Sequence, residues 1–388
     1  MIAKSMMTIG AIAPRTASRR QFVTISAIAA AWTCGRRPLA QVVREARGAP
    51  MADGLDAAQA LREVRRLAVE GYVNAVAWNW DGSHLAALSG FGGVVTVWQT
   101  NSWTVINKFK GPGGAYSQNS FSFLPDGTLL TSAASPTTLD PKCPTPITSS
   151  LTQWNSETGQ RVRDIPDLGC PSHIPPEGIG PTNTFAVSSD GSLVAGTGGK
   201  DVVLFETSSG SIIGRFAPPP TPEHPDWAAS IAISPDNRRI AMGTGFGHVH
   251  LFDVNNHAAS LSFIAFTGHL PGCAAITFSP DGRWLATGRG LISIGAIDDG
   301  WTRIWRASDG AMVAALTGGA GSVRSIDWNS SGNTLAVGDD GALRIWRTKN
   351  VPEEPHLIMR VRNNSYSLKF APNGTLGASD RNEIAIYR

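Results

Sequence analysis

The sequence predicts an all-β fold in which short strands recur in seven similar units. Glycine and proline are abundant, with 42 and 25 among 388 residues, as is typical of short strands separated by tight turns. Long helical patterns are almost absent. A tight-turn motif and an aromatic residue alternate along the chain with a basal period near 45 residues. A repeat of this length favours a ring or stack of β units.

The first fifty residues have the features of a targeting segment. Residues 1–48 carry a net charge of +7, which leaves −4 on the remainder. Ser18-Arg19-Arg20-Gln21-Phe22 precedes an apolar run, Val23 to Trp32, that is too short to span a bilayer. This arrangement resembles a twin-arginine export signal. We therefore expect residues 1–52 to be a signal peptide and flexible lead, and the mature protein to be periplasmic or extracellular, without a transmembrane segment. An organelle transit peptide is the alternative for a eukaryotic source.

The turn motif is the clearest sign of repetition. Asp-Gly and Asn-Gly suit the positive backbone angles of tight hairpins. The motifs end at Gly82, Gly127, Gly191, Asn237, Gly282, Gly332 and Gly374, with spacings of 45, 64, 46, 45, 50 and 42 residues. The aromatic residues that close the third strand of each unit are Trp98, Trp154, Phe205, Phe252, Trp305, Trp346 and Tyr387. Seven turns interleaved with seven aromatics indicate seven units.

The unit from Gly268 to Trp305 shows the pattern most completely. It holds a Gly-His pair, a Ser-Pro-Asp-Gly turn, an Asp-Gly pair and a terminal Trp. It resembles one WD40 repeat, and the chain is similar to seven-bladed WD40-type β-propellers. The resemblance implies a structural tetrad of hydrogen-bonded side chains at His269, Thr287, Asp299 and Trp305. Buried polar groups need such partners, so the tetrad predicts a blade and no reaction.

The seventh unit, residues 365–388, supplies three strands before the chain ends. A missing fourth strand would leave an open sheet edge. The segment Glu63 to Glu70 lies one strand upstream of the first unit, and we expect it to close the last blade. Residues 53–388 would then form one propeller, which we expect to be monomeric.

Insertions mark where function is added to such a scaffold. They occupy residues 134–150, 170–181, 217–227 and 289–298. In a WD40 ring, the loops between the second and third strands and the loops between blades share one face, so all four insertions would gather there. The alternative is neutral length variation of surface loops. The candidate partner-binding residues are Asp140, Lys142, His173, Glu177, His224, Trp227 and Arg289.

The sequence contains few motifs that indicate a disulfide, a metal site or a catalytic site. Cys143 and Cys170 lie in two of the inserted loops, and in an oxidising compartment they form a candidate disulfide. Cys273 is expected to be a core residue. His248 and His250 share one face of a strand, a spacing that can bind a metal, but a packed structural role is favoured because no third ligand is evident. No nucleophile elbow, phosphate-binding loop or Cys-x-x-Cys pair is present.

These observations favour a non-catalytic scaffold of the cell envelope that binds a protein or peptide partner through the loop-elaborated face. We expect no catalytic residue, metal or cofactor. The weakly acidic body lacks the basic stripe that nucleic-acid binding requires. The alternative is a propeller enzyme or small-ligand binder, hydrolase- or lactonase-like, with its site at the mouth of the central channel. A third reading is a purely structural envelope protein.

Overall fold

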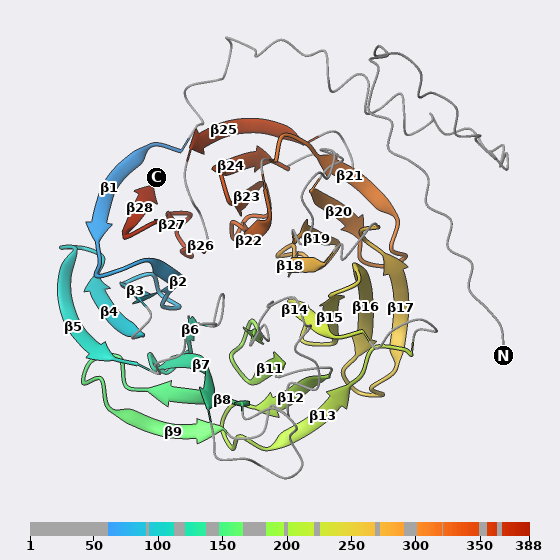
Figure 1. The fold of residues 1–388 in the computed structure, drawn as a ribbon, viewed down its shortest axis with the longest axis horizontal. Coiled ribbons are helices and arrows are strands. Elements are labelled where there is room, and N and C mark those ends of the chain that lie inside the picture. The colour runs from blue at the N-terminus through green and yellow to red at the C-terminus, as the bar shows by residue number, and fades with distance from the viewer. Residues whose placement is uncertain are drawn as a thin grey trace, which may run out of the picture. The chain divides into compact units, whose positions relative to one another are not determined.

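The computed structural model describes residues 61–90, 93–111, 121–136, 147–165, 184–197, 201–220, 226–267, 272–290, 301–319, 321–348, 355–362 and 367–388. All of them lie in one compact unit, Ala52–Arg388. Their strands form seven four-stranded antiparallel sheets around a common centre (Figure 1). This is a seven-bladed WD40-type β-propeller, and it confirms the predicted fold class.

Blades one to three each consist of four consecutive strands, ordered from the centre outward. The strands are β2 (Val73–Trp78), β3 (His84–Ser89), β4 (Val94–Gln99) and β5 (Thr104–Lys110); β6 (Phe121–Phe123), β7 (Leu129–Pro136), β8 (Ile147–Trp154) and β9 (Arg161–Ile165); and β10 (Phe185–Val187), β11 (Leu193–Thr197), β12 (Val202–Glu206) and β13 (Ile212–Phe216).

Blades four to six repeat the same order. Their strands are β14 (Ala228–Ile233), β15 (Arg239–Thr244), β16 (His248–Asp253) and β17 (Ala259–Ile264); β18 (Cys273–Phe278), β19 (Trp284–Arg289), β20 (Thr302–Arg306) and β21 (Met312–Leu316); and β22 (Val323–Trp328), β23 (Thr334–Asp339), β24 (Ala342–Arg347) and β25 (His356–Arg362).

The seventh blade joins the two ends of the propeller. It contains β26 (Leu368–Phe370), β27 (Leu376–Asp380) and β28 (Glu383–Tyr387), and its outer strand is β1 (Glu63–Ala68). Strand β1 runs antiparallel to β28, with Leu67 opposite Ile384. Backbone hydrogen bonds of 2.7 and 2.9 Å between Arg62 and Arg388 extend this pairing. The expected closure by the N-terminal segment is therefore confirmed.

The seven turns between first and second strands have the backbone geometry that their residues require. The last turn residue has a positive φ in every blade, from 60° at Asn237 to 83° at Gly374. Glycine and asparagine tolerate this region, whereas most residues do not. The periodic turn motif therefore reflects the positive φ that each inner hairpin requires at its last turn residue.

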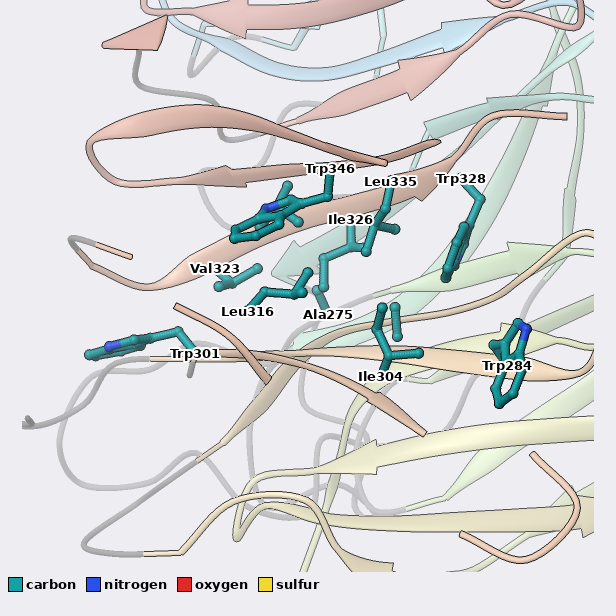
Figure 2. Close-up of a cluster of buried hydrophobic side chains, with 12 residues drawn as sticks. Ala275, Trp284, Trp301, Ile304, Leu316, Val323, Ile326, Trp328, Leu335 and Trp346 are labelled. Atoms are coloured by element: carbon teal, nitrogen blue, oxygen red, sulfur yellow. The ribbon is translucent and has the colours of Figure 1, made fainter. Parts of the chain in front are cut away.

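The apolar core lies between neighbouring blades. Figure 2 shows the cluster shared by blades five and six, in which Trp284 and Ile304 of blade five meet Trp328, Leu335 and Trp346 of blade six. Comparable clusters follow around the ring, and one combines Leu67 of β1 with residues of blades seven and one. Burial of these side chains holds the blades together.

The insertion in blade two differs from the expected loop. Strands β7 and β8 continue to Pro136 and Ile147, which lie opposite each other in register. Part of the inserted sequence therefore lengthens a hairpin, and residues 137–146 lie outside the described part of the chain. The longer hairpin keeps its backbone groups paired, which a loop of the same length would leave to solvent.

Candidate functional site

The two faces of the propeller differ in their connections. The elaborated face is defined here by the turns between second and third strands and by the links between blades. The short-turn face is defined by the turns between first and second strands, such as that ending at Gly82, and between third and fourth strands. The remaining inserted residues lie on the elaborated side of the topology, largely outside the described ranges.

Most of the candidate partner-binding residues also lie outside the described ranges, namely Asp140, Lys142, His173, Glu177 and His224. The same holds for Cys143, Cys170 and the tetrad members His269 and Asp299. Their roles remain predictions. The described candidates are Trp227 and Arg289, together with Thr287 and Trp305 of the tetrad.

Thr287 and Trp305 contact each other inside blade five. The Trp305 Nε1 donates a hydrogen bond to the Thr287 Oγ1 at 2.8 Å. Blade two contains the same contact, because Trp154 Nε1 donates to Thr131 Oγ1 at 3.0 Å. Sequence reasoning missed Thr131. Thr131 lies two residues after Leu129, which pairs with Trp154 in the neighbouring strand. Thr287 has the same spacing from Leu285, which pairs with Trp305. A search of the sequence for this spacing would have identified Thr131.

Trp227 lies on the elaborated face, directly before the inner strand of blade four. Its ring meets Phe246 edge-on, with ring centroids 5.2 Å apart and an interplanar angle of 66°. Both rings are partly exposed. A Cβ atom added at Gly245 would lie 2.1 Å from the Trp227 ring, so the absence of a side chain there lets the indole lie against the backbone.

The buried carboxylate of Asp226 holds this aromatic pair in place. Its Oδ1 accepts hydrogen bonds from the backbone NH groups of Trp227 at 2.9 Å and Phe246 at 3.2 Å. Its Oδ2 lies 3.0 Å from the Nδ1 of His248, whose side chain is 28% exposed while that of Asp226 is fully buried. One carboxylate therefore ties the blade link, the strand turn and an imidazole together.

His250 continues this arrangement into the protein. Its ring stacks on that of His248, with centroids 6.1 Å apart, and its Nδ1 lies 2.8 Å from the Ser262 hydroxyl. Burial and the neighbouring His248 lower the pKa of His250. The two imidazoles do share a face of β16, as expected. Among the described residues, no group of three or more His, Cys, Asp or Glu side chains is placed to hold a metal ion.

Arg289 differs from its expected place on an inserted loop. It is the last residue of β19 and is only 8% exposed. Its guanidinium lies 5.3 Å from the ring centroid of Trp301, and its Nη2 donates to the carbonyl of Thr267 at 3.3 Å. Stacking on the indole covers the guanidinium. Arg289 therefore contributes to packing and offers a partner little surface.

A central cavity of about 490 Å³ opens on the short-turn face, and inner strands of all seven blades contribute to its wall. Its charged lining residues are Asp327 and Lys369, whose carboxylate and ammonium lie 2.7 Å apart.

Cys273 lies in the core, where burial raises the pKa of its thiol to about 12. This thiol is therefore a packing group, as expected. Across the described ranges, no helix has the length and apolarity needed to cross a membrane.

Comparison with known proteins agrees with this architecture. Two ranges match the family model "WD domain, G-beta repeat". Residues 261–306 run from the outer strand of blade four to the third strand of blade five, and residues 310–347 run from the outer strand of blade five to the third strand of blade six. The chain is 27% identical to the U3 snoRNP-associated protein-like EMB2271 of Arabidopsis thaliana, over 42% of this chain and 32% of that protein.

Two further relatives have related names. The Target of rapamycin complex subunit wat1 of Schizosaccharomyces pombe is 34% identical over 22% of this chain and 24% of its own length. The Target of rapamycin complex subunit LST8 of Bos taurus is 27% identical over 43% of this chain and 48% of its own length. The matches with these three relatives span less than half the length of each relative.

One solved structure shares the fold over most of the propeller. A chain of the crystal structure of the Mitotic Checkpoint Complex superposes with a TM-score of 0.65, covering 88% of this chain and 96% of that chain. The two are 16% identical, so this likeness concerns the fold alone.

Proposed function

We propose that this WD40-type propeller is a non-catalytic scaffold that binds a protein or peptide partner through its elaborated face. The observation that carries the proposal is the partly exposed pair of Trp227 and Phe246. Aromatic side chains are enriched at protein interfaces, where they contribute large contact areas from few rotatable bonds.

The aromatic pair is also held ready for a partner. The turn that carries Phe246 and the backbone of Trp227 are both bonded to the buried Asp226. The Trp227 ring lies against Gly245, which limits its rotation. Groups that are already ordered lose less conformational entropy when they bind. The pair thus has the position, chemistry and rigidity of an interface anchor.

The relatives support the same class of function. By their names, LST8 and wat1 are subunits of target of rapamycin complexes, and EMB2271 is associated with the U3 snoRNP. By these names, the similar proteins are members or associates of larger assemblies. We extend the proposed interface to the loop residues Asp140, Lys142, His173, Glu177 and His224, which we expect on the same face.

Photocrosslinking from the two faces tests this proposal. A benzoylphenylalanine at position 246 samples the elaborated face, and one at Thr158 samples an exposed turn of the short-turn face. We expect a protein adduct from position 246 and none from position 158. In the chain with benzoylphenylalanine at position 246, Trp227→Ala should lose the adduct, whereas Ile213→Ala, on outer strand β13, should retain it. Adducts from position 158 alone would place the interface on the other face.

We also propose export of the protein by the twin-arginine route, on the basis of Ser18-Arg19-Arg20-Gln21-Phe22 and the apolar run that follows. The replacement Arg19→Lys/Arg20→Lys keeps the charge and removes the arginine pair. We expect the variant to accumulate as uncleaved precursor in the cytoplasm, measured by cell fractionation. Equal export of variant and wild type would contradict the proposal.

A further inference from the structure

The wall of the central cavity is uneven in charge. In blades two to seven, the penultimate residue of the inner strand lines the cavity. These residues are Ser122, Ala186, Ala232, Thr277, Asp327 and Lys369. Four of these are small and uncharged, and the first blade has Ala77 at the same place. The charged residues are confined to two adjacent blades, so one side of the cavity carries a polar group while the others leave space.

The polar group is built so that its cation faces the cavity mouth. One oxygen of Asp327 lies 2.7 Å from the Lys369 Nζ, and the other accepts the backbone NH of Phe370 at 2.8 Å. The Asp327 side chain is 8% exposed, whereas that of Lys369 is 53% exposed. The Lys369 carbonyl accepts a hydrogen bond from the Trp78 indole at 2.9 Å, which fixes this strand to blade one.

This geometry leaves donors available on the ammonium. A lysine ammonium has three hydrogens. Among the described residues, the Lys369 Nζ is bonded to Asp327, so the other hydrogens are directed to solvent at the mouth. Both oxygens of Asp327 are already engaged, so the pair offers donors and presents no free acceptor. It therefore suits an incoming acceptor and not a cation.

The exposed apolar surface of the cavity is concentrated at its rim. Val76, Ile231, Ile276 and Ile326 line the cavity but are each at most 8% exposed, because they pack between blades, whereas Trp80 at the rim is 39% exposed. A volume of about 490 Å³ lies within the range of small-molecule sites. An apolar group placed against the Trp80 indole leaves water, which favours binding.

We propose that the central cavity binds a small monocarboxylate through the short-turn face, with its carboxylate on Lys369 and its apolar part against Trp80 at the rim. A phosphate dianion fits less well, because a single cation faces its two charges and Asp327 repels a dianion more strongly than a monoanion. The same chemistry is present in a free carboxylic acid and in the C-terminal residue of an apolar peptide. The site lies on the face opposite the proposed partner interface and does not depend on it.

Calorimetric titration of the full-length chain tests the proposal with 4-phenylbutyrate and its neutral analogue 4-phenylbutyramide. We expect the carboxylate to bind and the amide to bind about tenfold or more weakly, since a charge-assisted hydrogen bond is lost. Lys369→Met should weaken carboxylate binding to a similar extent, and Lys369→Arg should retain it. Lys108→Met, at an exposed ion pair with Glu70, is the matched control and should bind as the wild type does.

A second variant protects the test against misfolding, because Lys369→Met leaves Asp327 without its cation. Thr277→Phe fills the cavity while the Asp327–Lys369 pair stays intact, and it should abolish binding with a retained melting temperature. The tripeptide Ala-Leu-Phe, with a free or an amidated C-terminus, distinguishes a peptide terminus from a small acid as the source. Equal affinity for acid and amide, unchanged binding by Thr277→Phe, or no binding of either free carboxylate by the wild type would overturn the proposal.

Discussion

Ser189, in the first turn of blade three, donates a hydrogen bond from its hydroxyl to the carbonyl oxygen of Pro235 in blade four, at 2.7 Å. The same turn position bonds to the next blade elsewhere. Ser330 Oγ donates to the carbonyl of the equivalent turn residue Pro372 at 3.1 Å, whereas Trp80 Nε1 donates to that of Phe123, two residues before the turn of blade two, at 3.0 Å.

The remaining blades have proline at this turn position. Each proline faces the turn glycine of the next blade, as Pro235 faces Gly282, where an added Cβ would lie 3.5 Å from the ring. The short-turn face is therefore joined from blade to blade around the ring. Hydrogen-bonding residues and prolines achieve this by different contacts, which explains why the motif tolerates Ser, Trp and Pro at one position.

Loss of one of these contacts should weaken the ring measurably. Ser189→Ala removes the donor to Pro235, and we expect the free energy of unfolding to fall by about 0.5–1.5 kcal/mol, the usual contribution of such a bond. Urea denaturation monitored by tryptophan fluorescence measures it. Ser211→Ala, an exposed serine at a turn in the same blade, is the control. Equal stability of both variants would show that the contact contributes nothing.

Closure of the ring by β1 predicts a large effect of its removal. Deletion of residues 60–70 exposes the edge of β28 and removes Leu67 from the cluster between blades seven and one. It also removes Arg66, which bonds to Asp380 and Glu383. We expect the melting temperature to fall sharply in calorimetry. An unchanged melting temperature would mean that β1 does not close the ring in solution.

The indole contacts of blades five and six predict a reciprocal pair of substitutions. Val337 of blade six occupies the register position of Thr287, and the buried Trp346 Nε1 has no hydrogen-bond partner. Thr287→Val should cost about 1–3 kcal/mol, because it leaves the Trp305 NH unpaired. Val337→Thr should raise stability by up to about 1 kcal/mol. Chemical denaturation of both variants measures this, and a loss of stability in Val337→Thr would refute the equivalence.

His250 predicts a dependence of stability on pH. Its folded-state pKa lies below the ordinary value of 6.5, so the unfolded chain binds more protons as the pH falls through that value. Its contribution to stability is present above pH 6.5 and is lost below it. We expect the free energy of unfolding to decrease from pH 7.5 to 5.0, with a smaller slope in His250→Gln. Parallel slopes in the two proteins would assign the pH dependence to other groups.

The candidate disulfide predicts a change in mass. If Cys143 and Cys170 are bonded, reduction of the exported protein should add two daltons in intact-mass spectrometry. Alkylation without reduction should then leave both cysteines unlabelled, while the double variant Cys143→Ser/Cys170→Ser should show no mass change. Free thiols at both positions in protein isolated from the envelope would end this prediction.

The sequence by itself determined the all-β class, the number of blades and the closing strand. Each inner hairpin needs a residue of positive φ, as at Asn237, and each third strand has a buried or half-buried aromatic at or next to its end, such as Trp305. These requirements are local, so they recur in the sequence at a readable period. The closing strand followed from counting, because a blade with three strands needs a fourth.

Only the tertiary structure decided which separated side chains meet, both within a blade and between blades. Lys369 pairs with Asp327, which lies one blade earlier in the sequence, and Arg289 is covered by Trp301 although it borders an insertion. The Asp226 contacts that position Trp227 and Phe246 likewise join a blade link to a strand turn. Such contacts depend on how strands and links pack within a blade and on how the blades pack around the ring. The periodic sequence pattern predicts each blade, because it reflects backbone geometry and burial within one unit. It does not predict which side chains contact one another.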